Sequence, residues 1–293
     1  MKPIAVLGHV AIDTIITKSG SRQELGGPLT YISLIFHELG VETVAVTKVG
    51  YDFPDIYAST LAERGVKVPK RSEEPTTRFI LDYTSGERTI RVPTVCEPIM
   101  PMEVESLPET AIIAPIIQEI PDSTIKKIRS SIIAIDPQGF VRHRKPDGEI
   151  SFQPWINREL LARTSVLKAS ERELGLITGV SGWDGLMKLN EGGVRVSLVT
   201  KGPGGADMIS DGVRFSIPTY SSLEIVDTTG AGDSFIAGFV SEYARGEPPI
   251  WCACYGSAAA SAVIETIGPR ITANRNEITR RAENIYDRLI RLS

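Results

Sequence analysis

The sequence alternates short apolar runs with longer amphipathic stretches, and this alternation restricts the fold of the chain more than any other feature. Short buried strands separated by helices are the pattern of a parallel sheet that is covered on both faces. Strands are predicted over residues 4–7, 43–49, 111–114, 132–135, 166–169 and 194–200. Helices are predicted over residues 28–39, 55–65, 122–130, 157–164, 171–178 and 183–191, with glycine or proline at most of the joins. The predicted class is therefore α/β.

One stretch breaks the alternation. Residues 77–92 show the alternation of every second residue that is typical of β-strands, and they predict two strands joined by a turn at 84–87. Phe79, Leu81 and Tyr83 fall on one face of the first strand. Because an isolated hairpin is marginally stable, it is predicted to share a small second sheet with the β-branched run at 13–17. We expect this sheet, formed by about residues 12–25 and 76–93, either to close over a ligand as a lid or to dock on a second copy of the chain through its open edges, giving a homodimer. The alternative is a surface hairpin with a purely structural role.

Composition excludes several classes of protein. The chain has 293 residues, of which 42% are hydrophobic and 23% charged, which is typical of a globular protein of one large domain. The net charge of −4 and the lack of a basic block exclude nucleic acid as an expected partner. No apolar run approaches the ~18 residues of a membrane-spanning helix. Three scattered cysteines, Cys96, Cys252 and Cys254, indicate a reducing compartment, so we expect a cytoplasmic protein.

The segment 227–233, Asp-Thr-Thr-Gly-Ala-Gly-Asp, is the strongest candidate for a functional site because it runs directly into an amphipathic helix. Small residues at Gly230, Ala231 and Gly232 allow the backbone to approach a ligand closely, and the first amides of a helix are free to donate to an anion. Asp233 falls in the first helical turn, where the helix dipole favours its negative charge. The segment therefore predicts a phosphate site beside a carboxylate base. The alternative is a tight turn in which Asp233 only caps the helix.

This segment resembles the carboxy-terminal signature of the ribokinase, or PfkB, family of sugar kinases. Asp13 resembles the sugar-binding aspartate of that family, and the pair Gly26 and Gly27 resembles its amino-terminal glycine pair. Residues 50–52, Gly-Tyr-Asp, and 200–205, Thr-Lys-Gly-Pro-Gly-Gly, resemble two further motifs in the same order. The resemblance spans residues 4 to about 270. It implies that residues 1–293 form one doubly wound α/β domain with a β-sheet lid.

The same resemblance implies ATP as the phosphoryl donor and Mg²⁺ as the metal. It makes Asp233 the base and residues 230–232 part of the anion-binding turn. The residues implied to bind the nucleotide are Thr200, Lys201, Gly202, Gly205 and Thr228. The Asn-x-x-Glu motif, which helps to place hydrated magnesium in the family, appears here with Ser170 in place of asparagine and with Glu173 retained. Magnesium placement is therefore expected to depend on Glu173 alone.

The expected acceptor is a small polyol or sugar. Pro28 and Tyr31 stand where ribose-specific members have lysine and asparagine, which argues against ribose. Residues 8–10, 26–31 and 135–142 most resemble short archaeal members, one kind of which phosphorylates myo-inositol. At the end of the strand over 132–135, the expected substrate-binding residues Asp136, Gln138 and Arg142 offer donors and acceptors to a polyhydroxyl ring. The alternative for Arg142 is a solvated charge beside Arg144 and Lys145.

Two other functions stay open from the sequence. One is a nucleoside kinase of the same fold, whose base-stacking pocket would be built from Tyr31, Phe36 or Phe53. The other is a catalytically idle relative that binds a ligand, since fold alone does not imply activity. Retention of Asp233 beside an intact Gly-Ala-Gly sequence argues against the idle relative.

Overall fold

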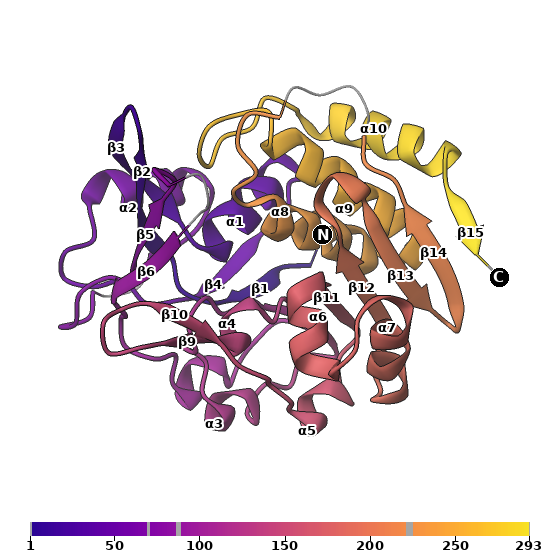
Figure 1. Ribbon diagram of the computed structural model, residues 1–293, viewed down its shortest axis with the longest axis horizontal. Helices are drawn as coiled ribbons and strands as arrows, with labels where there is room; N and C mark the ends of the chain where they lie inside the picture. The colour runs from indigo at the N-terminus through magenta and orange to yellow at the C-terminus, as the bar shows by residue number, and fades with distance from the viewer. Residues whose placement is uncertain (1, 69–70, 86–88, 221–224, 293) are drawn as a thin grey trace.

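The computed structural model describes residues 2–68, 71–85, 89–220 and 225–292, and over these ranges nine strands form one large sheet (Figure 1). The strand order is β15-β14-β13-β12-β11-β8-β7-β1-β4. The parallel strands are β1 (Ile4–Leu7), β4 (Thr43–Val46), β7 (Thr110–Ile113), β8 (Ile132–Ile135), β11 (Val166–Ser170) and β12 (Val196–Thr200). The antiparallel strands β13 (Ala206–Ser210), β14 (Val213–Ile217) and β15 (Ile290–Leu292) extend one edge. The predicted mostly parallel sheet is confirmed, and the antiparallel edge is an addition that the apolar runs did not predict.

Helices cover both faces of the large sheet, as a doubly wound fold requires (Figure 1). One face carries α1 (Pro28–Glu38), α2 (Asp55–Glu63), α8 (Ala231–Tyr243), α9 (Pro249–Val263) and α10 (Arg275–Asp287). The other carries α3 (Asp122–Ile125), α4 (Gln138–Val141), α5 (Arg158–Leu161), α6 (Glu171–Thr178) and α7 (Gly182–Glu191). Two of the predicted helices, at 122–130 and 157–164, are in fact single turns, α3 and α5. Side chains of each strand alternate between the two cores, so Val166 packs toward α8 whereas Leu167 packs toward α6 and α7.

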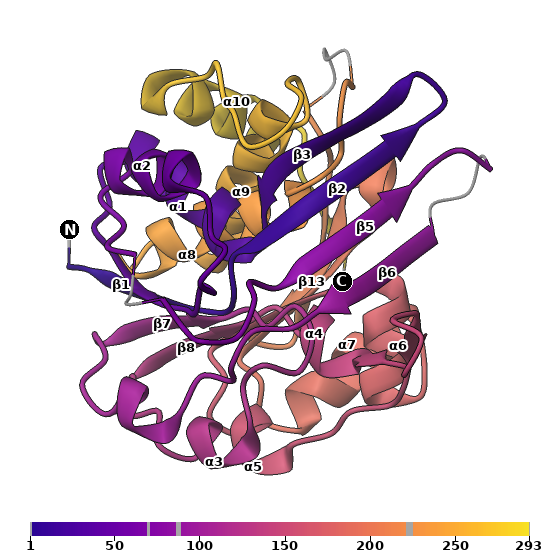
Figure 2. The same cartoon turned by 90° about the vertical axis from the view of Figure 1, so that its left-hand side faces the viewer.

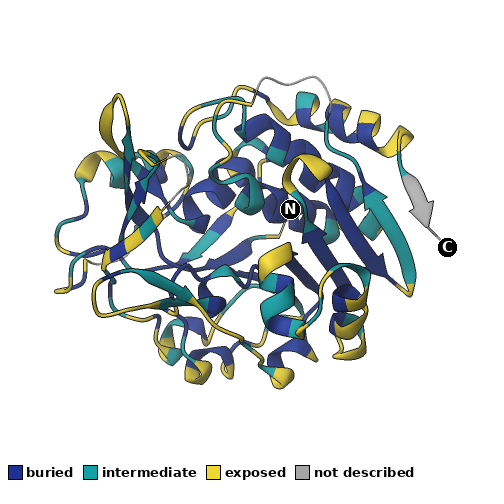
Figure 3. Cartoon of the chain, in the orientation of Figure 1, coloured by how far each residue is buried: buried dark blue, intermediate teal, exposed yellow. Residues whose placement is uncertain are grey.

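The small sheet is formed by β3 (Gly20–Gly26), β2 (Ala11–Thr17), β5 (Arg78–Asp82) and β6 (Thr89–Thr94), in that order. Strand β2 pairs with β3 in the antiparallel sense and with β5 in the parallel sense. The predicted sharing of one sheet by the hairpin and the 13–17 run is therefore confirmed, although turn residues 86–88 lie outside the described ranges. Figure 2 shows the four strands of the small sheet side by side, and Figure 1 shows them at the left-hand end of the molecule. In Figure 3 the central strands of the large sheet are buried and β14 is mostly intermediate, while the tip of the β2–β3 hairpin is exposed.

A buried polar cluster ties the base of the small sheet to the large sheet. The ring of His9, which follows β1, lies within 2.9 Å of Thr77 Oγ1 through Nδ1 and within 2.9 Å of the Glu97 carbonyl oxygen through Nε2. The Glu119 carboxylate accepts hydrogen bonds from the amides of His9 and Ile116, at 3.0 and 2.8 Å. Burial lowers the pKa of His9, which keeps the ring neutral. This cluster fixes where the small sheet leaves the large one.

A second hairpin, β9 (Arg142–Arg144) and β10 (Ile150–Phe152), borders the small sheet and was not predicted from the sequence. The Val92 amide of β6 donates to the Gly148 carbonyl oxygen at 2.7 Å, and Arg144 Nε donates to the Val92 carbonyl oxygen at 2.6 Å. The hairpin therefore places Arg142, its first residue, beside the gap between the two sheets. Within the described part of the chain, no helix combines the length and the apolar character that crossing a bilayer demands.

Candidate active site

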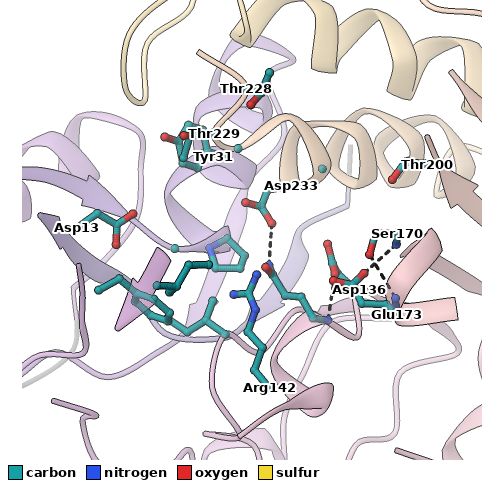
Figure 4. A pocket seen from close by; sticks show the side chains of 18 of the residues that line it. Asp13, Tyr31, Asp136, Arg142, Ser170, Glu173, Thr200, Thr228, Thr229 and Asp233 are labelled. Atoms are coloured by element: carbon teal, nitrogen blue, oxygen red, sulfur yellow. Dashed lines mark hydrogen bonds between the residues drawn. The ribbon is translucent and has the colours of Figure 1, made fainter. Parts of the chain in front are cut away.

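A cavity of about 260 Å³ lies at the carboxyl ends of the parallel strands, between the large sheet, the small sheet and the amino end of α8 (Figure 4). Open α/β sheets bind ligands at this edge. Its lining includes Asp13, Phe79, Leu81 and Ile90 from the small sheet, Asp136, Lys168, Ser170 and Thr200 from the large sheet and the residues that follow it, and Thr228, Thr229, Gly230, Gly232 and Asp233 from the turn and start of α8. Figure 4 shows Asp13 on one side of the cavity, Asp136 and Glu173 on the other, and Asp233 between them. Residues distant in the sequence thus converge on one space.

The turn before α8 is held by Asp227 and by close packing under its two glycines. Asp227 Oδ1 accepts a hydrogen bond from the Thr229 amide at 2.9 Å. Gly230 has φ 77°, and a Cβ there would overlap the ring of Tyr31 on α1. A Cβ on Gly232 would lie 2.8 Å from the Lys168 ammonium nitrogen. Both glycines therefore make room for side chains of the protein as well as for a ligand, and α8 starts with no side-chain cap on its free amides.

Asp233 is the carboxylate that faces the cavity from α8. Gln138 Nε2 donates a hydrogen bond to Asp233 Oδ1 at 3.3 Å (Figure 4). Burial and, next, the nearby Asp136 carboxylate raise the pKa of Asp233 to about 7, against the opposing effect of Lys168 and Arg142. A carboxylate with a pKa near neutrality is well matched to accept a proton from an alcohol. The arrangement fits the predicted base better than it fits a simple helix cap, since no side-chain capping bond is formed here.

Lys168 is the residue of this site that the sequence reasoning missed. It lies in the middle of β11 with 5% of its surface exposed, and its Nζ is 2.5 Å from Asp136 Oδ2. The sequence contained a signal, because a lysine inside an otherwise apolar strand is seldom buried without a partner. Asp136, predicted to bind substrate, is therefore engaged in a buried ion pair at the edge of the cavity.

Glu173 and Ser170 form a reciprocal cap at the start of α6. The Ser170 amide donates to Glu173 Oε2 at 2.8 Å, and the Glu173 amide donates to Ser170 Oγ at 3.4 Å. Both residues line the cavity, so the serine that replaces the asparagine of the resembled motif orders the glutamate. Over the ranges that the structure describes, no group of three or more His, Cys, Asp or Glu side chains could hold a metal by itself.

The remaining residues predicted for the nucleotide lie along two neighbouring cavities. One, of about 310 Å³, has a mostly apolar lining that includes Thr200, Gly202, Gly205, Tyr220, Ile225, Thr228, Ala231, Phe235, Ala260 and Ile264. It shares Thr200, Thr228 and Gly232 with the first cavity, so the two adjoin. Lys201 lines the other neighbouring cavity and donates to Asp207 Oδ2 at 2.7 Å.

The residues predicted for the acceptor gather at the other end of the first cavity. Asp13, Gly27, Gln138 and Arg142 line it, and Gly26 packs directly against the Asp13 carboxylate. Arg142 points toward Asp233 in Figure 4, which favours a role in the site over a solvated charge. Of the three aromatic residues considered for a nucleoside base, Tyr31 lines the cavity. The other two, Phe36 and Phe53, are fully buried in the hydrophobic core, so that part of the prediction is wrong.

Comparisons with known proteins identify the family of the chain. The family described as pfkB family carbohydrate kinase matches residues 1–276. A cytidine kinase from Thermococcus kodakarensis is 25% identical over 287 residues, covering 92% of this chain and 98% of the relative. An inositol 3-kinase from Arabidopsis thaliana is 26% identical over 281 residues, covering 90% of this chain and 74% of the relative.

A solved structure shares the fold. It is a pyrophosphate-dependent kinase of the ribokinase family in complex with a pyrophosphate analogue and myo-inositol. Its TM-score is 0.77 at 22% sequence identity, over 94% of this chain and 99% of that one. The predicted ribokinase-like fold is thereby confirmed.

Proposed function

Because the chain belongs to the pfkB family of carbohydrate kinases, we propose that it transfers the γ-phosphoryl group of ATP to a hydroxyl of a small polyol or sugar, with myo-inositol as the leading candidate. That the chain is a phosphotransferase with a hydroxyl acceptor follows from its family. The observation that carries the proposal is that a carboxyl group of raised pKa, Asp233, lies in the same cavity as the amino end of α8. One group can take a proton while the other stabilises the transferred phosphate.

The acceptor end of the cavity favours a polyol. Asp13 supplies carboxylate oxygens and Arg142 supplies guanidinium donors, which together match a ring of hydroxyl groups. Phe79 and Leu81 supply an apolar wall for the C–H face of the ring. Tyr31 packs under Gly230 and has 3% of its surface exposed, so little of its ring is available for a nucleoside base to stack on. These contacts support a compact polyhydroxyl acceptor over a nucleoside.

In the proposed reaction, Asp233 accepts the proton of the substrate hydroxyl as its oxygen bonds to phosphorus. Phosphoryl transfer depends mainly on positioning and on stabilisation of the charge on the phosphoryl oxygens. The amides that open α8 would stabilise this charge, and Gln138 would hold the Asp233 carboxylate toward the acceptor. Bound Mg²⁺ would neutralise part of the phosphate charge. Glu173 suits it, because its carboxyl group lines the cavity and is held there by the Ser170 amide, which donates to Oε2.

The apolar cavity beside the turn supports a nucleotide donor, because its lining suits a flat base. Its occupant is tested by Ala260→Phe, which adds a ring to the lining. We expect the KM for ATP to rise at least about tenfold with the fold intact by thermal melting. Ala62→Phe, at an exposed position of α2, serves as the matched control and should leave the KM for ATP and the melting temperature unchanged. Turnover with pyrophosphate that equals turnover with ATP, and is insensitive to Ala260→Phe, would contradict a nucleotide donor.

The acceptor is tested by an assay of ADP release with myo-inositol, ribose, fructose and cytidine. We expect the highest kcat/KM with myo-inositol. A higher value with cytidine would replace the polyol by a nucleoside, as in the relative from Thermococcus kodakarensis. Binding of ATP without turnover of any hydroxyl compound would instead support the idle relative.

We also propose that residues 1–293 form one domain in which the small sheet acts as a lid. Phe79, Leu81 and Ile90 of that sheet line the acceptor end of the cavity, so its movement would open or close access. Closure of a lid excludes water from a reacting phosphate. Strand β3 forms one edge of the small sheet, and this edge is where a second copy would dock.

A further inference from the structure

We propose that Lys168 is a further catalytic residue, whose ammonium contacts the transferred phosphoryl group and offsets the charge on its oxygens. The proposal rests on the phosphoryl transfer proposed above, but it does not depend on which alcohol is the acceptor.

The strand places Lys168 under the start of α8. Side chains of β11 alternate, with Leu167 and Ala169 in the core on the α6 and α7 side and Val166 in the core on the α8 side. Lys168 is two residues from Val166 and shares its face. Its ammonium reaches the cavity that Gly232 and Asp233 also line. Lys168 is therefore directed at the phosphate end of the site and not at solvent.

Stability alone does not account for a lysine at this place. A buried ion pair is often no more stabilising than a pair of apolar side chains of the same size. Burial lowers the pKa of Lys168, but the carboxylates of Asp136, Glu173 and Asp233 more than offset this effect, so that its pKa lies above the ordinary value. The charge is thus retained inside a core strand whose other side chains are almost entirely apolar.

The surroundings of the ammonium indicate an anionic ligand. Lys168 Nζ lies against the bare Cα of Gly232, within the first turn of α8. A helix carries partial positive charge at its amino end, so the first turn of α8 and the ammonium attract an anion to the same point. Within the described residues Nζ donates one hydrogen bond, to Asp136, although an ammonium carries three protons. A phosphoryl oxygen at the start of α8 would accept from both the amides and the ammonium.

A structural role for Lys168 must be separated from a catalytic one, because Lys168 also neutralises Asp136. The experiment therefore compares Lys168→Met in the wild-type chain and in an Asp136→Asn background, where no buried carboxylate is left unpaired. Lys48→Met is the matched control, since Lys48 pairs with Glu103 at 2.8 Å and lines none of the three cavities described here. Thermal melting checks the fold of every variant.

Two measurements give the answer: kcat with the best acceptor, and the affinity for a non-hydrolysable ATP analogue relative to ADP, by calorimetry. We expect Lys168→Met to lower kcat about 10²- to 10³-fold in both backgrounds. We also expect it to weaken binding of the triphosphate analogue about 10- to 100-fold. The affinity for ADP should stay within threefold of the wild-type value, since ADP lacks the transferred group. Lys48→Met should match the wild type.

The proposal is overturned if the double variant has the same kcat as Asp136→Asn. It is also overturned if Lys168→Met lowers the affinities for the analogue and for ADP by the same factor. A wild-type chain that binds neither nucleotide would refute the proposed donor, which is a separate outcome. Failure of every polyol as acceptor would leave the binding comparison intact, so the two proposals fail independently.

Discussion

Replacement of Asp233 by asparagine should abolish activity and stabilise the protein at the same time. The asparagine keeps an oxygen that can accept the hydrogen bond from Gln138, so the local geometry is preserved. It cannot accept a proton. A positioned base contributes about 10² to 10⁴ in rate, so the loss of kcat should be at least about 100-fold, or roughly 2.7 kcal/mol in the barrier.

The stabilisation follows from the raised pKa of Asp233. The ordinary value is 3.8 and the folded value is about 7. At pH values between the two, the folded protein keeps a proton on Asp233 that the unfolded chain has lost. The stability that this proton provides is therefore complete below about pH 4 and is lost as the pH rises to 7. At ~1.4 kcal/mol per pH unit, the Asp233 carboxyl group lowers the free energy of unfolding, relative to a side chain that does not titrate, by about 4 kcal/mol at pH 8 and by about half of that at pH 5.5.

Urea unfolding of wild type and Asp233→Asn at pH 5.5 and pH 8 measures this cost. We expect the variant to be the more stable of the two, and its advantage to be about 2 kcal/mol larger at pH 8. Asp287→Asn, at the exposed end of α10, is the matched control and should show no such dependence. An advantage that is equal at both pH values, or wild-type turnover by Asp233→Asn, would refute the reasoning about this carboxyl group.

Two further predictions concern the turn and the small sheet. Gly230→Ala should lower kcat and should lower the free energy of unfolding by more than the roughly 1 kcal/mol that a positive φ costs, because the added methyl overlaps Tyr31. Gly246→Ala, at φ 87° with no neighbouring atoms within 4 Å, measures the backbone cost alone, and an equal loss of unfolding free energy in the two variants would contradict the Tyr31 contact. Saturation with acceptor and nucleotide should slow amide hydrogen exchange in β5 and β6, and unchanged exchange would argue against a lid. Exchange in β3 that becomes slower when the protein concentration is raised, without ligands, would indicate docking of a second copy.

The parallel strands and the start of α8 could be predicted because each depends on a local pattern. Apolar runs such as 132–135 are long enough for a buried strand and too short for a helix, so their type follows from the sequence. The turn at 227–233 combines small residues with an amphipathic helix, and this combination predicted the start of α8, where the phosphate site is proposed. Asp136, Gln138 and Arg142 were likewise placed by the rule that side chains beyond the carboxyl ends of parallel strands meet at one edge.

What escaped prediction depends on contacts between distant segments. Lys168 lies within a run that was interpreted as apolar, and its ion pair with Asp136 joins two residues that are 32 positions apart in the sequence. The packing of Tyr31 under Gly230 joins α1 to α8 on one face of the large sheet. The hairpin β9–β10 carries few apolar residues and is ordered by hydrogen bonds to β6, so no hydrophobic periodicity in the sequence predicted it. Such features are set by tertiary pairing and not by local propensity.

The charges around the cavity explain why Asp233 can be both buried and reactive. Asp136 raises the pKa of Asp233, whereas Lys168 and Arg142 lower it, and the two cations approach from different elements, β11 and the β9–β10 hairpin. If Arg142 binds the acceptor and Lys168 binds the phosphoryl group, arrival of the two substrates engages both cations. Each then shares its charge with a ligand, so proton affinity at Asp233 rises when the alcohol is in place to give up its proton. Under these two proposals, the proton affinity of Asp233 is set by the side chains that bind the substrates and is highest in the complex in which the base would act.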